Sequence, residues 1–303
     1  MRAPAEVMTN SSEKYALHQC ALYKVQSKRK LAGLLFTSEK ALQGLARLGS
    51  AGYRTWTLTT PSGKTRQIED PLPNLKKIHA RLGDLLSRIM APQYLMCPVR
   101  GRSYISNAAA HHDAKTIVSL DVANYFPSTT DRRVYWFFNK VVNCSTDVAG
   151  LLTSLCTASG RLPTGSPVSP ILSYFAHISL WDEIATLCAG HNCTFSLYVD
   201  DITISGDAVP GELTWKANQL VHAVGLRTNK KKQRRHENGR AEVTGVILDN
   251  GAFRVPKRGY KNLHLRKLQL SKANLPEERQ QIRNAIRSIE SQHAQIRRAT
   301  KRA

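Results

Sequence analysis

Apolar and polar residues alternate with a period of two on both sides of an acidic turn near residue 200. This alternation predicts two short β-strands joined as a hairpin. Its apolar positions are Phe195, Leu197, Val199, Ile202 and Ile204. Asp200 and Asp201 therefore fall at the predicted tip. A solvated turn would also take aspartate, because that side chain bonds nearby backbone amides, so the tip alone does not establish a site.

A second predicted strand carries a third acid. Residues 116–122 are mostly β-branched or apolar, and Asp121 interrupts the apolar run near its end. An unpaired buried carboxylate is costly, so Asp121 needs a cation, a hydrogen-bond donor or an exposed strand end. If Asp121 and Asp200 lie on neighbouring strands, they can share two Mg²⁺ ions that activate a hydroxyl nucleophile and stabilise a leaving pyrophosphate.

Helical patterns lie on either side of these strands. The leucines between residues 31 and 48 have the spacing of two amphipathic helices that break near Thr37 and Ser38. Further helices are predicted over 74–90, over 130–138 and in the segment from Lys257 onward, which is rich in Arg, Lys and Gln. Residues 61–66 indicate a turn between strands, and residues 162–170 indicate a loop before a helix.

The charge balance indicates the class of partner. The chain has 44 Lys and Arg against 22 Asp and Glu, a formal charge of +22, so we expect it to bind a polyanion such as nucleic acid. It has no apolar run of membrane-spanning length and no signal-peptide pattern, so we expect no membrane partner and a cytoplasmic location. The six cysteines lack the spacing and the accompanying histidines of a zinc site.

Three segments, in order along the chain, resemble the palm of reverse transcriptases. Residues 198–201 match the signature tetrad of that family, and residues 120–128 resemble the motif with its first metal-binding aspartate. Residues 162–170 resemble the loop before the helix that packs under the template. The resemblance runs from about Trp56 to Leu268 and implies an α+β right-hand polymerase fold, with fingers, a palm of antiparallel sheet backed by helices, and a helical thumb.

The motif positions predict how the chain divides. We expect a basic helical element over 1–54, fingers over 55–115, and a palm over 116–245 with a fingers insertion at about 130–160. The thumb and the basic C-terminal helices would occupy 246–303.

The same resemblance implies roles for individual side chains. The three acids would bind two Mg²⁺ ions, Lys232 would approach the departing pyrophosphate, and Phe126 would lie under the incoming sugar and select dNTPs. The remaining nucleotide-binding residues would be Lys64, Arg66, Thr164 and Gly165. Thr164 stands where many members of the family have Gln, so a contact through a side-chain amide does not carry over. Lys64 and Arg66 would also suit a solvated basic hairpin, and residues 230–235 a basic patch that faces nucleic acid.

Two short elements resemble the bacterial retron branch of the family. Asn107 and His111 match its Asn-Ala-x-x-His element, although a structural role, with Asn107 capping a short helix, would also account for them. Residues 243–245 match a Val-Thr-Gly element linked to recognition of the enzyme's own RNA. The residues implied in RNA binding are Val243, Thr244, Gly245, Lys257 and Arg258. A strand that enters a turn at residues 249–251 would also fit this segment.

These features together predict an RNA-directed DNA polymerase of the retron type. The resemblance implies a cognate noncoding RNA as partner, dNTPs as substrates, priming from a guanosine 2′-hydroxyl, a single-stranded DNA product, and an effector protein in anti-phage defence. Two alternatives stay open: another bacterial reverse transcriptase, of an intron or a different defence system, and a palm-fold RNA-binding scaffold without catalysis.

Overall fold

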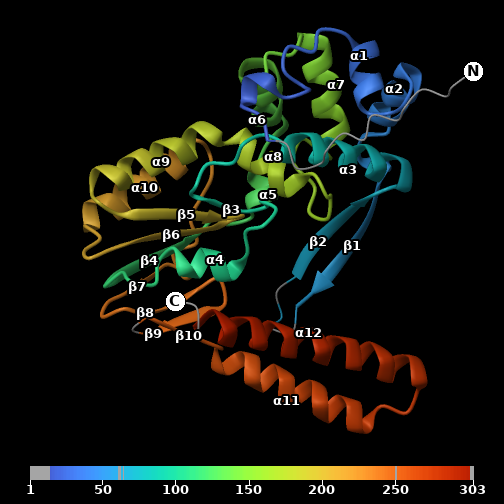
Figure 1. Cartoon of the computed structure of the whole chain (residues 1–303). Helices are drawn as coiled ribbons and strands as arrows, with labels where there is room; N and C mark the ends of the chain where they lie inside the picture. Colours follow the sequence, from blue (N-terminus) through green and yellow to red (C-terminus); the bar gives the residue numbers. More distant parts are fainter. Residues whose placement is uncertain (1–13, 61–62, 64, 250, 301–303) are drawn as a thin grey trace, which may run out of the picture. The chain divides into compact units, whose positions relative to one another are not determined.

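The computed structural model describes residues 14–60, 63, 65–249 and 251–300. The chain forms two compact units, each assembled from two stretches of sequence. The first runs to Pro92 and adds Asn124–Ile178, and the second takes Gln93–Ala123 and the residues from Ser179 onward. Both units combine helices and strands, which confirms the predicted α+β class (Figure 1). The predicted fingers, palm and thumb boundaries stay predictions.

The first unit combines a β-hairpin with helices. Strands β1 (Tyr53–Thr59) and β2 (Thr65–Pro71) pair antiparallel, as the turn at 61–66 predicts. Its helices are α1 (Lys28–Leu34), α2 (Glu39–Arg47), α3 (Pro73–Ser87), α5 (Tyr125–Ser128), α6 (Asp131–Trp136), α7 (Thr146–Cys156) and α8 (Ser169–Ala176). The predicted break between α1 and α2 is confirmed, because the Ser38 side chain accepts a hydrogen bond from the Ala41 amide and so caps α2. A π-helical turn at Phe137–Val141 extends α6.

The second unit is built on a five-stranded sheet in the order β3-β5-β6-β4-β7. The strands are β3 (Leu95–Cys97), β4 (Thr116–Asp121), β5 (Thr194–Tyr198), β6 (Asp201–Gly206) and β7 (Arg234–His236). β3 runs parallel to β5, and the other neighbours are antiparallel. The predicted strands on either side of residue 200 are therefore confirmed as a hairpin, although Val199 lies in its turn rather than in the alternating strand.

The two faces of this sheet differ in chemistry. Residues directly opposite in an antiparallel pair share a face, and alternate residues along a strand share it too. Ile202 and Ile204 with their partners Leu120 and Val118 form an apolar, buried face. Helices α9 (Ile178–Gly190) and α10 (Gly211–Ala223) cover that face (Figure 1). The other face carries polar side chains: Ser119, Asp121, Ser196, Tyr198, Asp201, Thr203 and Ser205.

A smaller sheet and a helix pair complete the second unit. Strands β8 (Arg240–Val243), β9 (Val246–Asp249) and β10 (Ala252–Arg254) form an antiparallel meander. Asp249 on β9 lies opposite Ala252 on β10, and Asn250, in the turn predicted at 249–251, lies outside the described residues. Helix α4 (Tyr104–Ala109) packs on this sheet through Ala108, which shares a buried cluster with Val243 and Val246.

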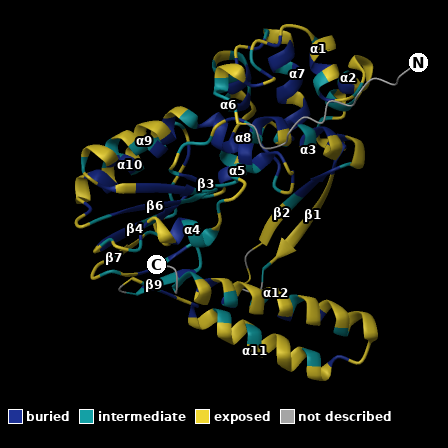
Figure 2. Cartoon of the chain, in the orientation of Figure 1, coloured by how far each residue is buried: buried dark blue, intermediate teal, exposed yellow. Residues whose placement is uncertain are grey.

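The chain continues into helices α11 (Lys257–Lys272) and α12 (Pro276–Thr300), which confirms the predicted helical segment. They pack on each other through Ala273, Ile282 and Ile286. Most of their remaining surface is exposed (Figure 2). Among the described residues, no helix is long and apolar enough to cross a membrane.

Candidate active site at the β5–β6 hairpin

The end of β4 and the β5–β6 turn bring two of the three predicted acids together. Asp121, the last residue of β4, lies directly opposite Asp201, the first residue of β6, so both side chains occupy the polar face. Asp200 lies in the turn, and its carbonyl accepts a hydrogen bond from the Val122 amide at 2.9 Å. The prediction that places Asp121 and Asp200 on neighbouring strands is therefore confirmed for the two strands, β4 and β6, whereas Asp200 itself lies in the turn and Asp201 is the residue opposite Asp121.

The turn itself is strained. Val199 has φ of +58°, a left-handed conformation that a β-branched residue rarely adopts. Such a residue costs about 1–3 kcal/mol and persists only where its surroundings enforce it. Here the pairing of Tyr198 with Asp201 closes a two-residue turn whose first position must have positive φ to match the twist of the strands. The hairpin thus fixes the backbone that carries both acids.

Lys232 lies against Asp121. Its Nζ is 2.6 Å from Asp121 Oδ2, and Asp121 is 7% exposed. The backbone amide of Asn229, three residues earlier, donates to the Asp121 carbonyl at 2.8 Å. Asn229 and Lys232, three residues apart, therefore both contact the same aspartate. The charge of Lys232 offsets part of the burial cost of that carboxylate.

Asp201 is the acid whose titration the site changes most. Its pKa is raised to about 6, first by burial, then by the neighbouring charges of Asp200 and Asp121, while Lys232 opposes the shift. Crowded carboxylates raise each other's pKa because each disfavours the charged form of its neighbour. The site therefore holds excess negative charge that a cation would relieve.

Oxygen ligands from carboxylates are the type that Mg²⁺ prefers. The crowding of Asp121, Asp200 and Asp201 fits a divalent cation in charge and in ligand chemistry. The positions of these side chains fit a bound cation less well. Within residues 14–60, 63, 65–249 and 251–300, no three Asp, Glu, His or Cys side chains converge closely enough to hold an ion. Asp121 instead contacts Lys232.

His111 ties the two strands of the hairpin together. Its Nδ1 lies 2.6 Å from Ser205 Oγ on β6, and its Nε2 lies 2.7 Å from Ser196 Oγ on β5. Burial lowers the pKa of His111 to about 4, so the ring is neutral near pH 7 and needs one donor and one acceptor. Serine hydroxyls can supply either. These partners could not be identified from the sequence, although both serines lie in strands where apolar and polar residues alternate.

The capping role considered for Asn107 is wrong. Ser103 caps α4, with Ser106 completing a reciprocal capping box. Asn107 lies inside the helix and is fully buried, and its Nδ2 donates to Thr244 Oγ1 at 3.3 Å. The two elements that resemble the retron branch therefore touch each other.

The Val-Thr-Gly element forms a turn of its own. Thr244 and Gly245 connect β8 to β9 and have φ of +44° and +84°. Arg258, at the start of α11, forms a two-pronged ion pair with Glu242 on β8, and Lys257 beside it is exposed. Arg258 is therefore already paired with an acid, whereas Lys257 is accessible.

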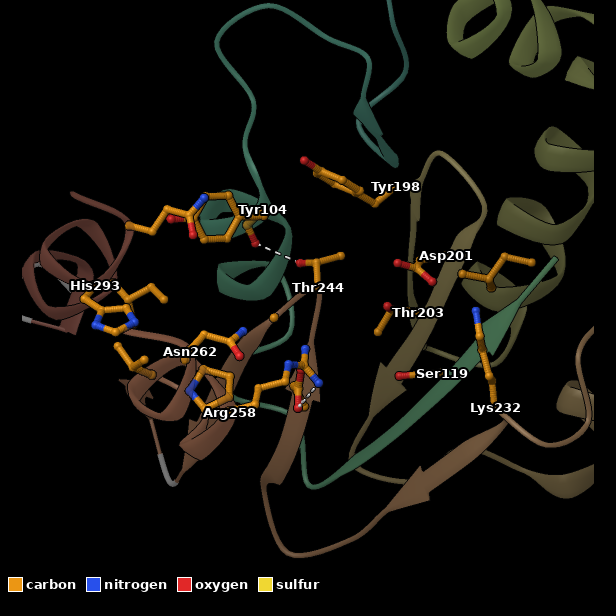
Figure 3. Close-up of a pocket in the computed structure, with 18 residues that line it drawn as sticks. Tyr104, Ser119, Tyr198, Asp201, Thr203, Lys232, Thr244, Arg258, Asn262 and His293 are labelled. Atoms are coloured by element: carbon orange, nitrogen blue, oxygen red, sulfur yellow. Dashed lines mark hydrogen bonds and ion pairs between the residues drawn. The ribbon is translucent and has the colours of Figure 1, made fainter. Parts of the chain in front are cut away.

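A cavity of about 730 Å³ joins these features within the second unit (Figure 3). Tyr198, Asp201, Thr203 and Lys232 line one side, on or beside the polar face of the sheet. The opposite side is formed by the β8–β9 turn and the helix pair. The residues there are Thr244, Gly245, Arg258, Asn262, Gln292 and His293. The cavity therefore extends from the acidic hairpin to the basic helices.

The other predicted nucleotide-binding residues belong to the first unit. Thr164 and Gly165 lie in a loop that packs on β2, where the Thr164 carbonyl accepts from the Glu69 amide at 2.6 Å. Gly165 has φ of +121°, and a Cβ there would lie 3.1 Å from Ile68 Cγ2, so only glycine fits.

Phe126 and Arg66 also lie in that unit. Phe126 is half-buried in α5 beside Tyr125, with ring centroids 6.0 Å apart, and Arg66 is exposed on β2. Lys64 lies outside the described residues. The roles of these residues stay predictions.

No protein-family model matches the chain. Curated relatives do match it. The retron Se72 reverse transcriptase of Salmonella heidelberg is 29% identical, over 77% of this chain and 64% of its own length. The retron Mx162 reverse transcriptase of Myxococcus xanthus is 28% identical over 68% of this chain and 50% of its own. The retron Ec86 reverse transcriptase of Escherichia coli is 24% identical over 70% of this chain and 68% of its own.

Among solved structures, a foamy viral protease–reverse transcriptase in complex with double-stranded DNA covers 90% of this chain at 16% identity, with a TM-score of 0.44. The chain spans about half to two thirds of the length of the curated relatives it matches. Those relatives match most of the chain, which confirms that it resembles the retron reverse transcriptases.

Proposed function

We propose that this chain is an RNA-directed DNA polymerase of the retron type. The observation that carries the proposal is the pairing of Asp121 with Asp201 on one face of the sheet, with Asp200 in the adjoining turn and Lys232 on Asp121. The curated relatives, which are named retron reverse transcriptases, support the same activity. In this assignment the five-stranded sheet belongs to the palm, the β1–β2 hairpin to the fingers, and α11 and α12 to the thumb.

The three aspartates would hold two Mg²⁺ ions, which supply Lewis-acid activation of the attacking hydroxyl and charge stabilisation of the leaving pyrophosphate. Lys232 would place a positive charge beside the same phosphates once Asp121 turns to its ligand. Because the pKa of Asp201 is raised, this carboxyl must lose its proton before it can bind a cation. Cation binding should therefore weaken below about pH 6.

The same assignment gives nucleotide-binding roles to residues of the first unit. Phe126 would exclude a ribose 2′-hydroxyl, and Lys64 and Arg66 would grip the triphosphate. The loop of Thr164 and Gly165 would support the new base pair through its backbone, because Gly165 has no side chain and the Thr164 carbonyl is held by β2.

The retron assignment adds a partner and a priming mode. Val243, Thr244 and Gly245, with Lys257 and Arg258, would contact a cognate structured noncoding RNA, and synthesis would begin at a guanosine 2′-hydroxyl of that RNA. The product would be single-stranded DNA joined to RNA, made in the cytoplasm and used with an effector protein in defence against phage. Nucleic acid that copurifies with the protein should then contain a branched RNA–DNA species.

Asp200→Asn tests the polymerase assignment. The variant should lose dNTP incorporation on an RNA template by at least about a hundredfold, because a metal-binding charge is removed, while RNA affinity changes little. Asp207→Asn is the matched control. Asp207 is an exposed acid at the far end of the same hairpin, paired with Lys115, and its loss should leave incorporation unchanged. Synthesis retained by Asp200→Asn would refute the proposed active site.

Joint replacement of Val243, Thr244 and Gly245 tests the retron part separately. Self-primed synthesis on the cognate RNA should fall more than extension of a generic primer on a generic template. An equal loss of both activities would remove the support for RNA recognition by this turn and would leave the polymerase assignment intact.

A further inference from the structure

The β8–β9 turn has a residue that the turn alone does not favour. Two-residue hairpin turns with positive φ at both positions usually take Asn and Gly, because a Cβ branch is strained there. Thr244 occupies the first of these positions, at φ of +44°. Contacts from outside the hairpin must therefore hold Thr244 in place.

Those contacts come from α4. The Thr244 hydroxyl donates to the Tyr104 carbonyl at 3.0 Å and accepts from Asn107 Nδ2 at 3.3 Å. Asn107 is 0% exposed, and its Oδ1 finds no hydrogen-bond partner among the described residues. A buried amide that leaves one of its polar atoms unsatisfied adds little to stability. We therefore assign the Asn107 side chain the role of holding Thr244 in place.

The same segment holds the catalytic hairpin at its other end. One turn beyond Asn107, His111 bridges Ser196 of β5 and Ser205 of β6. His111 lies in the turn that follows α4, where its amide donates to the Ala108 carbonyl at 3.0 Å, and both Asn107 and His111 are buried. The eight residues from Tyr104 to His111 thus contact both the β8–β9 turn and the β5–β6 hairpin.

Both contacts bear on one cavity. Thr244 and Gly245 lie on one side of it, and Tyr198 and Asp201 lie on the other (Figure 3). Tyr104, from the start of α4, lines it as well. The segment Tyr104–His111 therefore sets the distance between the two walls.

We propose that this segment is a rigid spacer that fixes the β8–β9 turn relative to the catalytic carboxylates, and that Asn107 is a positioning residue acting through Thr244. The nucleic-acid strand that enters the cavity would be placed against Asp201 by the turn. The inference deepens the proposed function and rests on it. It predicts that Asn107 and Thr244 act as one unit, so removing either has the effect of removing both.

The test is a double-mutant cycle measured by primer extension on a preannealed RNA template. Asn107→Ala and Thr244→Val each remove one partner of the hydrogen bond. Each should raise KM for the primer–template about fivefold, the effect expected of one neutral hydrogen bond, with little change in KM for dNTP. The double variant should match the single variants rather than multiply them. Thr244→Ser, which keeps the hydroxyl, should restore the wild-type KM.

Ser103→Ala is the matched control. It removes the N-cap of the same helix without touching Asn107 or Thr244, so it should lower the melting temperature but leave KM for the primer–template unchanged. If Ser103→Ala raised this KM as much as Asn107→Ala, or if the double variant were multiplicative, the spacer would be refuted. If Asn107→Ala does not fold, KM for the primer–template is compared between Thr244→Val, which lacks the hydroxyl, and Thr244→Ser, which keeps it.

A readout without catalysis separates this inference from the proposed function. Hydrogen exchange of the Gly245 and Val246 amides should speed up in Asn107→Ala and stay unchanged in Ser103→Ala. Unchanged exchange in Asn107→Ala would overturn the spacer even if the protein polymerises DNA. Faster exchange in a protein that incorporates no dNTP would uphold the spacer and reject the polymerase.

Discussion

At the scale of residues, the acids of the candidate site could be predicted because each aspartate interrupts an otherwise apolar or alternating run of residues. An aspartate near the end of an apolar strand is unusual enough to identify Asp121. Lys232, whose Nζ lies on that acid, was implied by the resemblance to the reverse transcriptase palm. The partners of His111 and Asn107 could not be predicted. Ser196, Ser205 and Thr244 are 85, 94 and 137 residues away in sequence, and only the fold brings them close.

Phe126→Ala is the residue-scale test of sugar selection. Shortening the side chain should open space beneath the sugar, so incorporation of rNTPs should rise relative to dNTPs by about tenfold or more, the discrimination that a lost steric contact gives. The ratio of kcat/KM for dCTP and CTP on one template measures it. Tyr125→Phe is a suitable control. Tyr125 is in the same helix as Phe126, and the change removes only its hydroxyl, which donates to the Ser173 carbonyl in α8, so the ratio should not change. An unchanged ratio in Phe126→Ala would refute the selecting role.

At the scale of elements, strands and long helices followed from hydrophobic period, whereas short connections did not. The hairpin on either side of residue 200, the strand 116–121 and the helices after Lys257 were all predicted. The turn at Thr244 and Gly245 was not, since Thr-Gly lacks the Asn that marks such turns. The π-helical turn at Phe137–Val141 was also missed, because one inserted residue barely disturbs a helical pattern.

The helix pair α11–α12 should bind nucleic acid through phosphates rather than bases. Most of its cations are exposed, and they outnumber the acids, which are Glu277, Glu278 and Glu290. Replacing Lys261, Arg283 and Arg287 by Gln should weaken binding to an RNA–DNA duplex at low salt. The slope of log K against log salt should fall by about 3 if each cation meets one phosphate.

Lys216→Gln is the control for this helix pair. Lys216 is a cation on α10 that is already paired with Glu212, so its loss should leave the slope unchanged. If the slope of log K against log salt stayed unchanged in the variant with all three cations replaced, the duplex would not bind along α11–α12.

At the scale of the whole molecule, buried histidines should make the protein sensitive to acid. Burial lowers the pKa of His79 and His111 to about 4 and that of His177 to about 3, from 6.5. Between the folded pKa and 6.5, each of these histidines is protonated in the unfolded chain and neutral in the folded protein. The stability that each contributes is complete above pH 6.5 and is lost as the pH falls toward 4.

Asp201 acts in the opposite direction. Its folded pKa of about 6 lies above the ordinary 3.8, so folding retains a proton between those values. Near pH 5, unfolding should then take up about 2 protons net, because the three histidines gain about three and Asp201 loses about one. The free energy of unfolding should therefore fall by about 3 kcal/mol per pH unit. Urea unfolding at pH 7, 6 and 5 with chelator present measures this slope. A free energy of unfolding that stays level from pH 7 to 5 would contradict the burial of these rings.

The left-handed valine at the apex of the acidic hairpin bears on the proposed polymerase activity. The backbone of this turn loses its freedom once, when the protein folds, so the turn would not have to be ordered again at each nucleotide addition. Val199→Gly would restore backbone freedom at this position. It should lower the turnover rate and leave the yield of folded protein unchanged.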